Sequence, residues 1–272
     1  SDQERWVCSQ ITNHENGQCY WIFNDDASDV HDRYTYQHAK FTIIDDTWLL
    51  TGSENLNPSS MPSDDKSDGT EGNRGIYIAT NASDLISHAL DIFHRDVDPA
   101  NHKDIRPFDV LLDGPPSGFS PDYSSGGTSY TIKFPDPLVL DATFDFEVVQ
   151  SPDNAIRATG SLIGMVERAG AGGEVYVEQM SEHPFWGPTT SDPDTDPNPR
   201  LEAYMDAARR GAIVRILLDS GFDVPSDPRS NASACTYVNS VASTENLDLE
   251  CLTGNHTNTG IHNKMVLVWD GT

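Results

Sequence analysis

The 272-residue sequence predicts an α/β fold in which a mixed β-sheet is flanked by helices on both faces. Short apolar runs typical of strands alternate with segments whose apolar residues recur at the spacing of one helix face. Two of these helical segments end in glycine directly before an apolar strand. In addition, a His-x-Lys pair stands before two strands, at His38 and at His262.

The first His-x-Lys pair leads into a predicted β-hairpin. Phe41 to Ile44 is an apolar run that predicts one strand, and Trp48 to Thr51 predicts the next. Asp45 and Asp46 lie between them and predict a tight turn.

Polar side chains gather at the ends of this hairpin. Because residues two apart on a strand point to the same face, we expect His38 and Lys40 to lie together. Ser53 and Asn55 follow the second strand. An imidazole, an ammonium group and these two donors would suit an anionic, tetrahedral ligand.

The pairing recurs near the end of the chain as His262-Asn263-Lys264, before the apolar run Met265 to Val268. Lysine is scarce in this sequence, so two lysines in the same local pattern indicate a repeat. The lysines are Lys40, Lys66, Lys103, Lys133 and Lys264.

The two copies resemble the H-x-K-x4-D motif of the phospholipase D superfamily, whose members build one active site from two copies. The first copy matches through Asp45 and continues as G-S-x-N from Gly52 to Asn55. The second matches at His262 and Lys264, whereas Trp269 stands at the aspartate position and Asp270 follows it. The resemblance implies two phospholipase D-like repeats.

The resemblance also implies a metal-independent phosphodiesterase that works through a covalent phosphohistidine, without any cofactor. His38 would be the nucleophile and His262 the general acid. Lys40 and Lys264 would neutralise the phosphoryl oxygens, which removes the need for a metal, and Ser53 and Asn55 would bind the substrate by hydrogen bonds.

Three functions are compatible with these motifs. A nuclease-like phosphodiesterase is favoured, and a phospholipid hydrolase or phosphatidyltransferase is the second possibility. The substrate would be a nucleic acid or a phospholipid headgroup. A non-catalytic cell-surface binding module is the third, favoured by Trp269 and by Gly75, which stands where the family often has a glutamate.

Three parts are expected along the chain. Residues 1–98 would be the C-terminal part of the first repeat, 99–141 a Pro- and Gly-rich connection, and 142–272 the N-terminal part of the second repeat. Both repeats look incomplete, so the sequence resembles a fragment of a longer protein. A homodimer could complete the site.

Local patterns predict the remaining helices and strands. The helices are expected at Asp84 to Arg95 (capped by Asn81 or Ser83), Ala155 to Ala169 (capped by Asp153 or Asn154), Pro199 to Arg210 and near Cys235 to Ser243. The strands are expected at Cys19 to Phe23, Gly75 to Thr80, Phe146 to Val149, Glu174 to Met180, Ile213 to Asp219 and Leu247 to Leu252. Between them lies a polar loop whose His183, Phe185 and Trp186 could line the site.

The composition is strongly acidic, with 43 acidic against 17 basic residues and a formal charge of −26. An acidic, lysine-poor surface is typical of proteins from high-salt environments. Charge alone would argue against a nucleic-acid partner. At molar salt, however, the Debye length falls to about 3 Å, so overall charge does not decide the partner.

The four cysteines form two local pairs, each preceding a His-x-Lys motif. This arrangement favours disulfides Cys8–Cys19 and Cys235–Cys251 over buried thiols, and neither pair has zinc-site spacing. Disulfides indicate an oxidising compartment, so we expect an extracellular or cell-surface protein. The sequence contains no run long enough to span a membrane.

Overall fold

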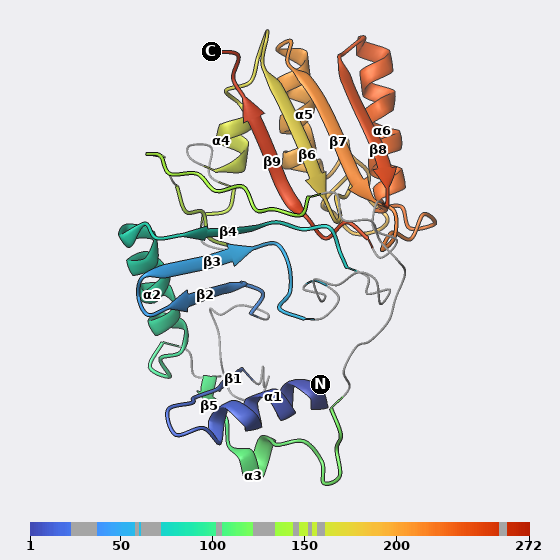
Figure 1. The fold of residues 1–272 in the computed structure, drawn as a ribbon. Helices are drawn as coiled ribbons and strands as arrows, with labels where there is room; N and C mark the ends of the chain where they lie inside the picture. Colours follow the sequence, from blue (N-terminus) through green and yellow to red (C-terminus); the bar gives the residue numbers. More distant parts are fainter. Residues whose placement is uncertain are drawn as a thin grey trace. The chain divides into compact units, whose positions relative to one another are not determined.

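The computed structural model describes residues 1–22, 37–57, 60, 72–101, 105–121, 134–143, 147–151, 154–156, 161–255 and 260–272 (Figure 1). The chain divides into two compact units: Ser1–Thr51 with Ile78–Ser124, and Gly52–Tyr77 with Ser125–Thr272. The two units are interleaved along the chain. The segment Gly52–Tyr77, which follows the first motif, belongs with the second motif.

The first unit carries the predicted hairpin. Strands β2 (Phe41–Ile44) and β3 (Trp48–Gly52) pair antiparallel, and β4 (Tyr77–Thr80) is the third strand of this sheet. Asp45 and Asp46 have φ values of 49° and 52°, the left-handed conformation that a tight two-residue turn requires at both central positions. The predicted turn is therefore confirmed.

Helix α2 (Ser83–Asp96), which the sequence predicted at Asp84 to Arg95, packs on this hairpin. Its buried Ile86 and Ala89 pack with Leu49 of β3. The predicted cap was wrong, because Ala82 is the N-cap residue and the described helix has no capping side chain. Thr80 instead accepts a hydrogen bond from the N–H of Ala82, so the turn before the helix uses the side chain of a strand residue.

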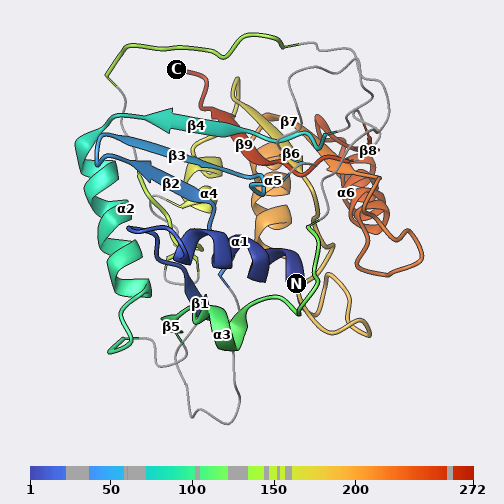
Figure 2. The same ribbon diagram turned by 60° about the horizontal axis from the view of Figure 1, so that its bottom comes forward.

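The first unit also contains a second group of elements, which begins at the N-terminus (Figure 2). Helix α1 (Asp2–Thr12) is linked through Cys8–Cys19 to β1 (Tyr20–Ile22), which pairs antiparallel with β5 (Ile105–Pro107). Helix α3 (Val110–Asp113) follows β5. The rest of the predicted first strand, from Phe23, lies outside the described residues.

The second unit is built on a four-stranded sheet in the order β8-β7-β6-β9 (Figure 1). Strands β6 (Glu174–Gln179), β7 (Ile213–Asp219) and β8 (Leu249–Gly254) are parallel, and β9 (Lys264–Trp269) runs antiparallel to β6. The predicted strands are thus confirmed within one or two residues at their ends. The sheet is mixed, as predicted.

Helices α4 (Leu162–Val166), α5 (Pro199–Arg209) and α6 (Asn231–Glu245) pack on one face of this sheet. The strands alternate accordingly, with the core side chains fully buried on the helical face. On the other face, Tyr176 and Leu252 are exposed. Helices on both faces were predicted. Among the described residues, the three helices that pack on this sheet share a single core on one of its faces.

The start of this unit also differs from the prediction. Helix α4 begins at Leu162, with Ser161 as its cap, because the Ser161 hydroxyl accepts the N–H of Gly164. Asn154 to Ile156 form a turn instead of the predicted helix start, and Glu147 to Val149 are not a strand. Phe146 lies outside the described residues. Among the described helices, none is long and apolar enough to cross a membrane.

Candidate functional site

The second motif histidine lies beside a buried carboxylate. His262 lies two residues before the start of β9, and its Nδ1 lies 3.2 Å from Oε1 of Glu54. The two side chains are 10% and 2% exposed. Glu54 comes from the G-S-E-N stretch after the first motif, 208 residues away, so tertiary structure alone creates this pair. Sequence reasoning had assigned Glu54 no role.

Neighbouring polar groups hold this stretch against the second motif. The Ser53 hydroxyl lies 3.4 Å from both Glu54 Oε1 and Asn263 Oδ1, and it accepts the N–H of Ile76. Asn263 in turn donates to Glu178 of β6 at 3.0 Å. Ser53, predicted to bind substrate, therefore lies buried within the network that carries the second motif.

Backbone hydrogen bonds fix the same contact. The N–H of Arg74 donates to the carbonyl of Gly260 at 3.0 Å, and the N–H of His262 donates to the carbonyl of Arg74 at 2.9 Å. Arg74 and Ile261 thus form a parallel bridge. The position of His262 depends on strand-like pairing between two distant segments of the chain.

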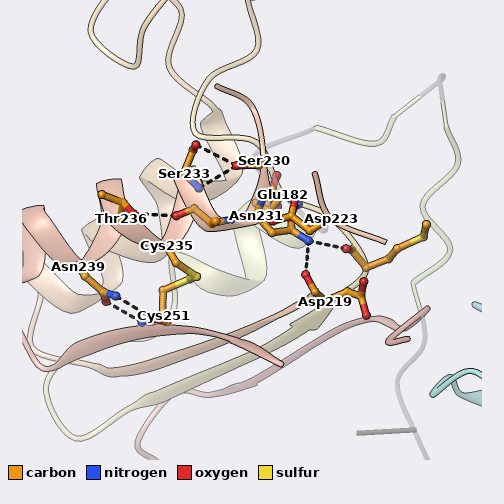
Figure 3. The surroundings of a disulfide bond; sticks show 12 residues. Glu182, Asp219, Asp223, Ser230, Asn231, Ser233, Cys235, Thr236, Asn239 and Cys251 are labelled. Atoms are coloured by element: carbon orange, nitrogen blue, oxygen red, sulfur yellow. Dashed lines mark hydrogen bonds between the residues drawn. A yellow bond between two sulfur atoms is a disulfide. The ribbon is translucent and has the colours of Figure 1, made fainter. Parts of the chain in front are cut away.

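A buried aspartate supports the residues before His262. Asp219 ends β7 with no exposed surface, and its carboxylate accepts the N–H groups of Ile261 and Phe222. Asn231, at the start of α6, donates to the carbonyls of Asp219 and Met180 (Figure 3). The carboxyl ends of β6 and β7 are therefore tied together beside the segment that carries the motif. Ligands bind at this edge in many α/β proteins.

Lys264 supplies positive charge beside the imidazole. Its Nζ donates to the backbone carbonyl of His262 at 2.7 Å and lies 3.3 Å from His262 Nδ1. The Glu54 and Lys264 contacts with the ring are both made at Nδ1. Nε2, on the far side of the imidazole, is therefore the nitrogen left for chemistry.

Trp269 and Asp270 close the second motif at the end of β9. Trp269 is exposed, and its indole N–H donates to the carbonyl of Thr272. Asp270 accepts hydrogen bonds from the hydroxyl and the N–H of Thr272, and these bonds lower the pKa of its carboxyl. Both hydrogen bonds thus join Asp270 to Thr272, two residues further along the chain.

The first motif lies in the first unit. His38 is exposed just before β2, and the Nζ of Lys40 donates to its carbonyl at 2.6 Å. The Thr51 hydroxyl donates to the carbonyl of Lys40, which fixes the strand after His38. Asp45 lies in the hairpin turn. The convergence of His38 with His262 stays a prediction.

Asn55 lies in the second unit with Ser53. Its carbonyl accepts a hydrogen bond from the hydroxyl of Tyr77 at 3.3 Å. Burial, together with the nearby charge of Glu54, raises the pKa of Tyr77. Ser53 and Glu54 thus contact residues of the second motif, whereas the backbone of Asn55 is held by Tyr77. The role of the Asn55 side chain in binding stays a prediction.

Another polar cluster surrounds the loop after β6. The carboxylate of Glu182 is buried and accepts from Asn198 and from Arg200 at 2.6 and 2.8 Å. Trp186, 44% exposed, lies with its ring 5.4 Å from the guanidinium of Arg200. Burial and the charge of Glu182 raise the pKa of Tyr204. The predicted loop thus carries the exposed ring of Trp186, which packs against the guanidinium of Arg200, and the ion pair with Glu182 holds that guanidinium in place.

Both predicted disulfides are present. Cys8 pairs with Cys19, and Cys235 of α6 pairs with Cys251 of β8 (Figure 3). Each joins residues 11 or 16 positions apart. The second disulfide fastens α6 to the sheet next to Asn231, whose side chain supports the site.

No protein-family model matches the chain, and no curated protein matches it. Among the described residues, no group of three or more His, Cys, Asp or Glu side chains is arranged to hold a metal ion. The motifs and the geometry of the second unit are therefore the basis for assigning a function.

Proposed function

We propose that this protein is a metal-independent phosphodiesterase of the phospholipase D type. The observation that carries the proposal is the imidazole of His262, whose Nδ1 lies against buried Glu54 while the ammonium group of Lys264 stands beside it. A histidine held at one nitrogen by a carboxylate is suited to transfer a proton at the other. The nearby ammonium is suited to neutralise a phosphoryl oxygen.

The reaction would take place in two steps. In the first, a ring nitrogen of His38 bonds to phosphorus while the bond to the leaving oxygen breaks, and His262 gives its Nε2 proton to that oxygen. In the second, water attacks phosphorus and gives a proton to His262 as the bond to His38 breaks. The products are an alcohol and a phosphomonoester. Lys40 and Lys264 stabilise the charge on the non-bridging oxygens throughout.

A nucleic acid is the substrate we favour. Trp186 presents an exposed ring on the same carboxyl edge of the sheet that supports His262, and Arg200 packs against it. A rigid aromatic ring backed by a cation is a surface on which nucleobases stack, at about 1–3 kcal/mol per base. The phosphatidylcholine headgroup has no aromatic ring that could stack in this way.

A non-catalytic module that binds anionic groups is the second candidate. It is favoured by the local hydrogen bonds of Asp270 with Thr272 and by Trp269 at the aspartate position of the second motif. Such a module would keep the lysines and lose turnover.

A substrate panel tests the proposal. Single-stranded DNA, RNA, phosphatidylcholine vesicles and bis-p-nitrophenyl phosphate are incubated with the protein in molar KCl, each with and without a chelator. We expect the protein to cleave single-stranded nucleic acid and the activated ester at the same rate with and without the chelator. Trp186→Ala should slow the cleavage of nucleic acid but not that of the activated ester. Cleavage of vesicles alone would assign the phospholipid function. Binding of anionic polymers without turnover of any substrate would assign the non-catalytic module.

We also propose that the protein works outside the cell in a high-salt environment. Two disulfides require oxidising conditions for their formation, and a charge of −26 is best tolerated where salt screens it.

A further inference from the structure

Glu54 is a buried charge that the proposed reaction does not use directly. Its residue is 1% exposed, and its Oε1 lies within hydrogen-bond distance of the Ser53 hydroxyl and His262 Nδ1. Its Oε2 is also buried and has no hydrogen-bond partner among the described residues. A carboxylate in such a place loses its hydration and depends on the few donors that reach it, so His262 is its main compensating partner.

Space for Glu54 exists only because residue 75 is glycine. A Cβ atom built on Gly75 would lie 1.9 Å from Oε1, 2.1 Å from Cγ and 2.2 Å from Cδ of Glu54. Real Cβ atoms do not approach other atoms so closely, so any larger residue at position 75 would displace the carboxylate. The neighbouring Arg74 pairs through its backbone with Gly260 and His262. One short segment therefore positions the motif backbone and makes room for the carboxylate.

The contacts also select one tautomer of the imidazole. An ionised carboxylate can only accept hydrogen bonds, so a proton on Nδ1 of His262 satisfies Glu54. The Lys264 ammonium lies 3.3 Å from the same nitrogen and donates to the His262 carbonyl at 2.7 Å. An unprotonated Nδ1 would set its lone pair against the Glu54 carboxylate oxygen, which has no proton to share, so the Glu54 contact decides the tautomer. With the proton on Nδ1, the lone pair of neutral His262 lies on Nε2, which is where the second step needs a base.

We propose that Glu54 is the positioning residue of His262 and that Gly75 is required because it makes room for Glu54. The chain segment after the first motif thereby determines which ring nitrogen of His262, the histidine of the second motif, carries the proton. This inference rests on the proposed function for its catalytic consequence, whereas the tautomer it assigns to His262 can be measured without turnover.

The primary test is the ring tautomer in the full chain. Long-range ¹H–¹⁵N NMR correlations distinguish Nδ1–H from Nε2–H imidazoles, and the His262 signals are identified by their loss in His262→Ala. We expect Nδ1–H in the wild-type protein and a shift towards Nε2–H, the commoner tautomer in water, in Glu54→Ala. An unchanged tautomer in folded Glu54→Ala would refute the positioning role.

A double-mutant cycle tests the role of Gly75. Gly75→Ala should change the tautomer as Glu54→Ala does. Adding Gly75→Ala to Glu54→Ala should have no further effect, since the three atoms nearest to the added Cβ are removed with the Glu54 side chain. Gly170→Ala is the matched control, because a Cβ there meets its nearest neighbour at 3.7 Å. Equal, additive effects of Gly75→Ala in both backgrounds would show that Gly75 acts without Glu54.

A carboxylate exchange guards against misfolding of the single variants. Glu54→Ala combined with Gly75→Glu places a carboxylate at the other position, in the volume that Glu54 vacates. We expect this pair to regain the Nδ1–H signal and at least a tenth of the wild-type turnover, with Glu54→Ala about 10⁴-fold slower than wild type, as when a catalytic histidine loses its orienting carboxylate. If the double variant is as slow as Glu54→Ala and lacks the Nδ1–H signal, a carboxylate beside His262 is not what positions the imidazole. If no variant or wild type turns over substrate but the tautomer responds as described, the positioning role stands and the proposed function fails.

Discussion

The ammonium nitrogen of Lys264 lies 2.7 Å from the backbone carbonyl oxygen of His262. Lys40 reaches the carbonyl of His38 in the same way, at 2.6 Å. Side chains two residues apart share one face of an extended strand, so this hydrogen bond holds each lysine beside its histidine. The two motifs therefore share this hydrogen bond although they precede strands of different sheets, while His38 is exposed and His262 is buried. That they belong to two repeats stays a prediction.

The roles of the two motif histidines can be separated by leaving-group chemistry. His38→Ala should abolish turnover of every phosphodiester, because no other group forms the covalent intermediate. His262→Ala should retain activity towards bis-p-nitrophenyl phosphate, since its leaving group departs without a proton. Lys40→Ala should lose about 10²–10³-fold in kcat, as on removal of one charge-stabilising donor. An active His38→Ala variant would contradict the mechanism. Trapping of a phosphohistidine in His38→Ala but not in His262→Ala would exchange the two roles.

Arg200 should stabilise the fold through buried Glu182. Arg200→Met removes the charge that pairs with a carboxylate of no exposed surface, and should lower the free energy of unfolding by about 3 kcal/mol, the lower end for breaking a buried pair. Adding Glu182→Gln should recover much of this loss, because the uncompensated charge disappears while an acceptor for Asn198 remains. Urea unfolding followed by circular dichroism measures both. Equal stability of wild type and Arg200→Met would show that the pair is energetically neutral.

The two disulfides should be reduced in order. Cys8–Cys19 is half-buried, whereas Cys235 and Cys251 are 7% and 1% exposed, so a mild reductant should reach the first bridge before the second. Native mass spectrometry should show a gain of two protons and then of four. Loss of either bridge should lower the free energy of unfolding by about 2–4 kcal/mol. Simultaneous reduction at the lowest reductant concentrations would contradict the burial difference.

Acid should weaken the first unit through Asp113. Hydrogen bonds from the Arg106 guanidinium, one at 2.6 Å, lower the pKa of the Asp113 carboxyl. A carboxyl with a lowered folded-state pKa stabilises the protein above its unfolded-state pKa of about 3.9, and this contribution is lost as pH falls through the folded-state value. Asp113→Asn should therefore unfold at lower temperature than wild type at pH 7, and the difference should shrink below about pH 4. Arg106→Met should remove the same pH dependence. If the difference in unfolding temperature between Asp113→Asn and wild type stays constant with pH, the Asp113 carboxyl is not the group that makes stability depend on pH.

Salt should stabilise the whole chain. With a charge of −26, mutual repulsion destabilises the compact state, and salt screens it over distances beyond about 3 Å at 1 M. The unfolding temperature should rise steeply between low and molar KCl at pH 7. Repeating the series near pH 4.3, the isoelectric point of the sequence, is the control, because the net charge there is close to zero and the rise should largely vanish. The same rise at both pH values would assign the effect to general salting-out instead of charge screening.

The sequence by itself determined the local elements of this protein. The hairpin around Asp45, strand Ile213–Asp219 and the helix that starts at Pro199 follow from near-neighbour sterics and hydrogen bonds, which act over a few residues. The disulfide pairs were also predictable, since each joins cysteines close in the sequence.

Only the tertiary structure decided which distant groups meet. It placed Glu54 on His262, opened the space at Gly75 and brought Asp219 to the backbone before the motif. It also gathered α4, α5 and α6 on one face of the four-stranded sheet, where helices on both faces were expected, and started α4 later than its apolar pattern indicated. Such contacts depend on how the chain folds back on itself. A glutamate or a glycine looks the same in a local pattern whether it faces water or fills the space beside a histidine 208 residues away.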